Sequence, residues 1–153
     1  MSRVFGNMKY LLLIVLFLAA PKAHAFWGLG SVNYSNVSIV DINALLYPFS
    51  DYQSNSYEPH QGVRGLFVEP SLGLAGSNLF VGYGHITGES LPVGYEIGGL
   101  VGRSYLFNYG VEKNRMYYGA ALKSNIVFIP IKIGLLVDEE ETAKVMFEIG
   151  LGF

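Results

Sequence analysis

Apolar residues follow two different patterns along this chain. Near the N-terminus they form one continuous run, Tyr10–Ala20, whereas further along they alternate with small or polar residues. An alternation with a period of two is typical of β-strands, because successive side chains of a strand point to opposite faces. The run and the alternating part therefore predict different structures.

The first 25 residues have the three regions of a secretory signal peptide. Two basic residues precede the apolar run, Pro21 ends it, and the segment Ala23–Ala25 has a small residue at each end, which is the pattern of a cleavage site. The run is too short for a membrane-spanning helix, which needs about 20 apolar residues. We expect cleavage after Ala25, which leaves residues 26–153 as one mature domain.

The clearest alternation is at the C-terminal end of the chain. One face of the stretch 142–153 consists of Ala143, Val145, Phe147, Ile149, Leu151 and Phe153. One face of the stretch 127–137 consists of Val127, Ile129, Ile131, Ile133, Leu135 and Val137. The acidic segment Asp138–Glu141 lies between them, so the pattern predicts a hairpin with a wholly apolar face.

Four further stretches alternate in the same way: Leu66–Leu74, Leu79–Ile86, Pro92–Leu106 and Arg115–Lys123. Turns are expected at Gly76–Asn78 and at Ser124–Asn125, and the pair Gly98–Gly99 predicts a bulge or bend.

The N-terminal part of the mature chain alternates less clearly. Ser31–Val40 and Ile42–Phe49 are candidate strands, and the polar segment Ser50–Gln61 predicts a loop. These two strands would bring the number to eight, the smallest common closed barrel.

The face opposite the aliphatic rows indicates on which side of the sheet water lies. It consists mainly of Gly, Ala, Ser and Tyr with single charges, which is too little charge for the exterior of a soluble barrel. Such a face fits a barrel interior, where Glu69, Glu96 and Glu148 can pair with Lys123 and Lys132. The aliphatic face then meets lipid, where strands must close on themselves because a bilayer core offers no hydrogen bonds. The predicted fold is therefore an all-β, closed, antiparallel up-and-down transmembrane barrel.

The last residues resemble a known group of proteins. The ending Val145–Phe153 alternates and finishes on an aromatic residue, and it is similar to the C-terminal insertion signal of outer-membrane β-barrel proteins of Gram-negative bacteria. The resemblance implies that the barrel-assembly machinery reads Phe153 and that both termini lie in the periplasm, so that Asp138–Glu141 lies outside the cell. Pro70 and Pro130 depart from the pattern, because a proline inside a strand removes a ladder donor.

Composition excludes several other classes of function. Removal of the first 25 residues leaves seven of the ten Lys and Arg against all twelve Asp and Glu, and an acidic chain without a basic cluster is not expected to bind nucleic acid. There is no cysteine, which excludes disulfides and thiolate metal sites. His60 and His85 are the only histidines of the mature part and lack metal-ligand spacing, so we expect no metal and no cofactor.

Three functions remain compatible with these patterns. The first is a monomeric outer-membrane barrel with a structural, surface or narrow-pore role and no catalysis, whose partners are outer-membrane lipid and the export and barrel-assembly machinery. The second is a lipid A-modifying enzyme of the deacylase kind that uses His85 at the barrel rim, although the residues around His85 and Ser90 do not match the motif of that group. The third is a soluble periplasmic barrel that binds an apolar ligand.

Overall fold

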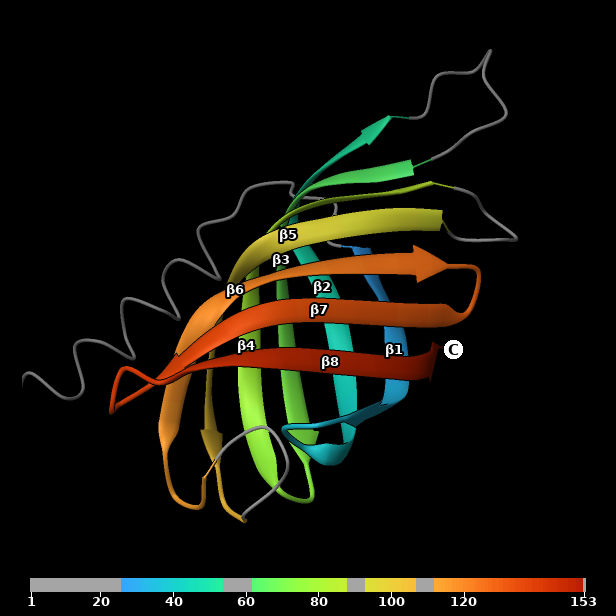
Figure 1. Ribbon diagram of the computed structural model, residues 1–153. Helices are drawn as coiled ribbons and strands as arrows, with labels where there is room; N and C mark the ends of the chain where they lie inside the picture. Colours follow the sequence, from blue (N-terminus) through green and yellow to red (C-terminus); the bar gives the residue numbers. More distant parts are fainter. Residues whose placement is uncertain (1–25, 54–61, 88–92, 107–111, 153) are drawn as a thin grey trace, which may run out of the picture.

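The computed structural model describes residues 26–53, 62–87, 93–106 and 112–152. In these ranges the chain forms one closed antiparallel barrel in which each strand pairs with the next and β8 pairs with β1 (Figure 1). The eight strands are β1 (Phe26–Ser35), β2 (Ile39–Gln53), β3 (Gly62–Gly73), β4 (Gly76–Thr87), β5 (Val93–Ser104), β6 (Met116–Ile126), β7 (Ile129–Asp138) and β8 (Ala143–Gly152). The prediction of an all-β, closed, eight-stranded antiparallel barrel is confirmed.

Several expectations from the sequence concern residues that the structure does not describe. The predicted signal peptide, His60, Ser90 and Phe153 all lie outside the described residues. Within the described ranges, no helix is both long and apolar enough to span a membrane.

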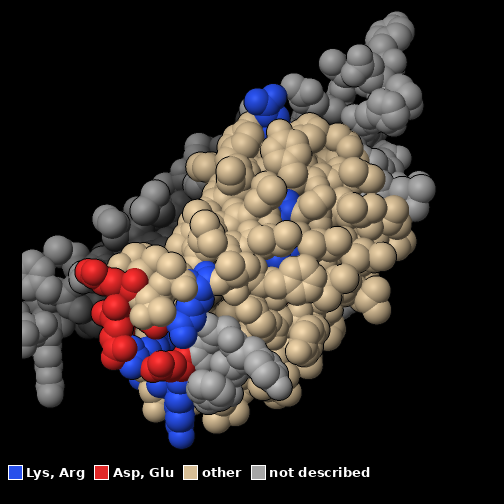
Figure 2. Space-filling model, viewed as in Figure 1, with Lys and Arg blue, Asp and Glu red and all other residues tan. Residues whose placement is uncertain are grey.

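The two faces of the strands lie on the two sides of the barrel wall, and the apolar face is the outer one. Ile133 is 54% exposed, Leu135 66% and Ile149 40%, whereas Lys132 and Glu148 next to them are almost completely buried. Figure 2 shows one side of the molecule, where the wall is nearly free of charge and the charged side chains gather at the end that carries the β7–β8 turn. The predicted faces of β7 and β8 are therefore confirmed.

Two of the predicted turns are wrong. Gly76–Asn78 begins β4, and the connection from β3 is made by Leu74 and Ala75 instead. Ser124 and Asn125 belong to β6, and the turn is Val127–Phe128, where Val127 has a φ of 59°. The turn prediction failed because Asn78 and Asn125 are buried inside the barrel. Asn is common in turns, but here these polar side chains are part of the polar interior.

The bulge expected at Gly98–Gly99 is absent from the described ladders, since β5 pairs with β4 and with β6 in unbroken register across both residues. One register shift lies between Leu46 and Phe49 in the β2–β3 pair, and this segment contains Pro48, which has no N–H to donate. Pro70 and Pro130 lie in unbroken register in the β3–β4 and β6–β7 pairs. Toward β2, however, the β3 ladder has no residue pair at Glu69 or Pro70.

The β1–β8 seam closes the barrel and has the shortest ladder. Five residue pairs join these strands, from Ser31–Gly152 to Ser35–Glu148, whereas twelve join β4 and β5. Asn36, in the β1–β2 turn, extends the seam beyond β1. Its Nδ2 donates to the Val145 carbonyl at 2.8 Å, and its Oδ1 accepts from the Phe147 N–H at 2.9 Å.

The side chain of Asn36 therefore acts as an additional strand residue, because an amide group offers the same donor and acceptor as a peptide unit. The backbone N–H of Asn36 adds a third hydrogen bond, to the Phe147 carbonyl at 3.2 Å.

Replacing Asn36 by Ala is expected to lower the free energy of unfolding by about 1–3 kcal/mol, because two backbone groups of β8 lose their partners. Chemical denaturation of the refolded protein measures this change. Asn36→Asp should lose part of this stability, since a carboxylate accepts from Phe147 but cannot donate to Val145. Equal denaturation midpoints for all three proteins would show that the seam does not depend on this side chain.

Candidate functional site in the barrel interior

Polar and charged side chains from all eight strands are buried inside the barrel. The five charged residues predicted for the interior lie on five different strands, and all five are buried: Glu69, Glu96, Lys123, Lys132 and Glu148. Each occupies an inward position of its strand, because the residues directly before and after it point to the outer face.

Four of these five residues form one continuous chain of ion pairs. Lys132 Nζ lies 2.7 Å from Glu69 Oε1 and 2.9 Å from Glu148 Oε1. Lys123 Nζ contacts the other oxygen of Glu69. Glu69 also accepts a hydrogen bond of 3.3 Å from Asn43 Nδ2. The chain links strands β3, β6, β7 and β8 across the interior, and a buried charge that is paired in this way does not incur the large cost of an isolated one.

Glu96 stands apart from this chain of ion pairs. Both of its carboxylate oxygens accept from Asn125 Nδ2, at 2.9 and 2.7 Å, and Oε1 also accepts from the Tyr47 hydroxyl at 3.2 Å. Among the described residues, no Lys, Arg or His lies within ion-pair distance of Glu96. The structure thus brings four of the five predicted charges together and gives the fifth neutral partners.

Three of the residues that hold these charges were missed by the sequence reasoning: Asn43, Tyr47 and Asn125. The inward position of Asn125 could have been predicted, because Asn125 is two residues beyond Lys123 and therefore lies on the same face of the strand. Asn43 and Tyr47 gave a weaker signal, since they lie on β2 before and within the register shift.

Large side chains fill much of the remaining interior. The ring of Phe67 lies between those of Tyr47 and Phe80, with centroid distances of 6.1 and 4.7 Å. Lys132 Nζ lies 5.3 Å from the centroid of Phe80, a distance at which a cation is attracted by an aromatic face. Tyr117 is also fully buried. The ion pairs and the aromatic rings together form a packed plug.

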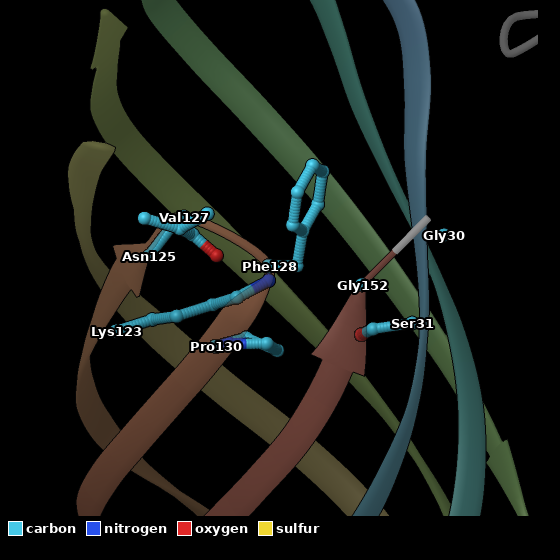
Figure 3. A pocket seen from close by; sticks show the side chains of 8 residues that line it. All are labelled: Gly30, Ser31, Lys123, Asn125, Val127, Phe128, Pro130 and Gly152. Carbon is cyan, nitrogen blue, oxygen red and sulfur yellow. The ribbon is translucent and has the colours of Figure 1, made fainter. Parts of the chain in front are cut away.

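A small cavity lies at one end of this plug, between the β6–β7 turn and the paired ends of β1 and β8 (Figure 3). Its volume is about 20 Å³, and Lys123, Asn125 and Ser31 supply its polar lining. A polar cavity of this size holds about one water molecule. It does not offer room for a substrate.

The histidine candidate lies elsewhere, on the outer wall. His85 is half-buried and is paired across the strands with Arg64 and Tyr95. Its ring centroid lies 6.3 Å from that of Tyr95. In the described part of the chain, no set of three or more His, Cys, Asp or Glu side chains is arranged to hold a metal ion.

A second group of charges lies at the barrel end that carries the β7–β8 turn. Arg115 is 2.7 Å from Glu112 and 2.6 Å from Glu140. The hydrogen bond from Arg115 holds the pKa of Glu140 below its ordinary value. This ion pair therefore stabilises the fold above the ordinary pKa of Glu and is lost as the pH falls through the lowered value. Both side chains are solvated, so the contribution is small.

Replacing Lys132 by Met is expected to cost about 3–5 kcal/mol of stability, because it leaves Glu148 without a cation and removes one of two from Glu69. Thermal or chemical denaturation measures this loss. Adding Glu148→Met to the same protein should recover part of it, since the double variant no longer buries an unpaired carboxylate. Lys144→Met is the matched control, because Lys144 is only half-buried and has no ion pair among the described residues. A loss of the same size in the control would contradict the special role of Lys132.

Comparison of the chain with models of protein families, with curated proteins and with solved structures finds no match, so the geometry of the barrel itself carries the functional argument.

Proposed function

We propose that this protein is an integral β-barrel of the outer membrane of a Gram-negative bacterium, with a sealed interior and a structural or surface role. The observation that supports the proposal most strongly is the reversed distribution of its side chains. Charged and polar residues are buried inside the barrel, and large apolar residues are exposed on every one of its eight strands.

An outer wall of this kind is unfavourable in water. Monomeric soluble proteins rarely expose a contiguous apolar patch larger than a few hundred Å², whereas here the exposed apolar side chains follow one another around the barrel. Acyl chains remove this penalty, and closure of the barrel leaves no backbone edge that would be unpaired in lipid. The same distribution argues against a soluble barrel with an apolar ligand, which needs an apolar interior and a polar exterior.

The height of the apolar wall also fits a bilayer. On β5 the outward side chains between Tyr95 and Arg103 are uncharged. The eight residue steps from Tyr95 to Arg103 span about 26 Å along the strand at about 3.3 Å per residue, or about 20 Å across the membrane at a strand tilt of about 40°. This value is close to the apolar band of about 25 Å in outer-membrane barrels.

Outward tyrosines lie near both ends of the wall. Tyr83 and Tyr95 are exposed toward the end where β3 and β5 begin, and Tyr34, Tyr105 and Tyr118 toward the opposite end. Aromatic residues prefer the two membrane interfaces, so these residues support two girdles. With both termini in the periplasm, as the C-terminal resemblance implies, the β1–β2, β3–β4 and β7–β8 turns face the outside of the cell.

The packed interior favours a structural or surface role over transport. Glu69, Lys132 and the rings of Phe67 and Phe80 occupy the middle of the barrel, which in a barrel of eight strands leaves no wide path for solutes. Within the described ranges His85 makes no hydrogen bond to a hydroxyl or a carboxylate, so nothing in these ranges favours the alternative of a rim enzyme.

A charge placed in the middle of the outer wall distinguishes lipid from water around it. Ile133→Arg, near the centre of β7, is expected to destabilise the protein in bilayers by about 2–4 kcal/mol. Leu74→Arg, in the β3–β4 turn at the barrel end, should cost only about 0–1 kcal/mol. Both original side chains are exposed, at 54% and 72%. Folding titrations in phospholipid vesicles measure the two values, and equal small effects would mean that the wall faces water.

Fractionation and electrophoresis test the location directly. The protein is expected in the outer-membrane fraction, released only by detergent, with a gel mobility that changes when the sample is boiled. In planar bilayers the purified barrel should show no open channel at low voltage, because its interior is filled. Recovery in the soluble periplasmic fraction would refute the proposal.

A further inference from the structure

The polar interior differs in its hydrogen bonding from one end of the barrel to the other. Around the chain of ion pairs, Glu69 and both lysines have partners at short distance. Toward the β1–β2 and β3–β4 turns, eight buried side-chain atoms have no hydrogen-bond partner in the described part of the chain. Seven of them are oxygens, Asn33 Oδ1, Ser38 Oγ, Asp41 Oδ2, Ser71 Oγ, Asn78 Oδ1, the Tyr117 hydroxyl and Glu148 Oε2, and the eighth is the nitrogen Nδ2 of Asn78. All belong to residues that are at least 94% buried. Buried polar groups usually have partners, so this group of atoms is unusual.

The strand register places these residues around one region of the interior. Asn33 is opposite both Asp41 on β2 and Gly150 on β8, and Glu148 lies two residues from Gly150 on the same face. A side chain at Gly150 would collide with Asn33 Oδ1, and a Cβ at Gly73 would lie 3.0 Å from the Cβ of Asp41. The two glycines therefore provide the space that these polar side chains occupy.

The same region carries an excess of negative charge. Among the described interior residues, Asp41, Glu69, Glu96 and Glu148 face two lysines, and neither lysine contacts Asp41. Among the described residues, the side-chain donor to Asp41 is Asn33 Nδ2, at 2.9 Å. Asp41 is opposite Asn33, and Glu148 is opposite Ser35, two residues further along the same face of β1, so the two carboxylates enter the same region of the interior. Buried like charges are unfavourable without a compensating cation.

We propose that this region is a binding site for a hard metal cation, with Ca²⁺ as its ligand and with Asp41 and Glu148 as the charged groups. Ca²⁺ takes six to eight oxygen ligands from carboxylates, amide carbonyls and other oxygen donors in flexible geometry, and seven of the eight unpartnered atoms are oxygens of carboxylates, amides and hydroxyls. Its negative ligands would be Asp41, which has no ion pair among the described residues, and the oxygen of Glu148 that does not contact Lys132. The site contains no His or Cys, the side chains that zinc and copper prefer.

Calcium binding is tested on the purified, refolded protein after treatment with a chelator. Addition of Ca²⁺ is expected to raise the denaturation midpoint, because a ligand that binds only the folded state stabilises it. Tb³⁺, a luminescent substitute for Ca²⁺, should show emission on excitation of tyrosine, since the buried Tyr117 lies beside the carboxylates, and Ca²⁺ should displace it.

Variants locate the site. Asp41→Asn is expected to abolish both the calcium-dependent shift and the competition with Tb³⁺, yet to remain at least as stable as the original protein in chelator, because it relieves the repulsion with Glu148. Ser71→Ala should weaken calcium binding without abolishing it. The matched control is Glu96→Gln, whose carboxylate is held by Tyr47 and Asn125, and which should keep the full shift.

Absence of any calcium-dependent shift in the original protein would overturn the inference, as would a full shift in Asp41→Asn or an equal loss in Glu96→Gln. These measurements need only a folded barrel, so their outcome is independent of whether the protein fractionates with the outer membrane.

Discussion

Closure of the sheet is the constraint on which the rest of this structure depends. Once β8 pairs with β1, the two faces of every strand become an inside and an outside, and no strand keeps an unpaired edge. The period of two in the sequence then decides which side each residue occupies. The chain uses this division in the reverse of the usual sense, with aliphatic residues outside and ionisable residues within.

The narrow interior explains why both signs of charge are needed there. Carboxylates from β3 and β8 would repel one another without Lys132 between them, and the aromatic rings of Phe67 and Phe80 complete the filling. Removal of solvent makes such contacts strong and makes any missing partner costly. The interior thus ties together strands that are distant along the chain, in addition to the hydrogen bonds of the wall.

The sequence was sufficient to predict the barrel, the number of its strands and the faces of β7 and β8, because a strict alternation over many residues has only one geometric meaning. It failed at the turns, since Asn78 and Asn125 are residue types common both in turns and in a crowded polar interior. The packing of the Tyr117 ring over Gly102 could not be predicted either, because it depends on which residues face each other across β5 and β6. The partners of the charges, such as Asn43 and Tyr47, depend on the register between strands, and the register shift near Pro48 could not be placed from residue pattern alone.

The amide of Asn36 has a consequence for the dimensions of the whole molecule. In a closed sheet the stagger between the first and last strands, the shear, determines the tilt of the strands and the diameter of the barrel. By hydrogen-bonding to Val145 and Phe147, Asn36 favours the same stagger as the five residue pairs between β1 and β8. One side chain in the first turn therefore helps to fix the diameter of the space into which every interior residue must fit.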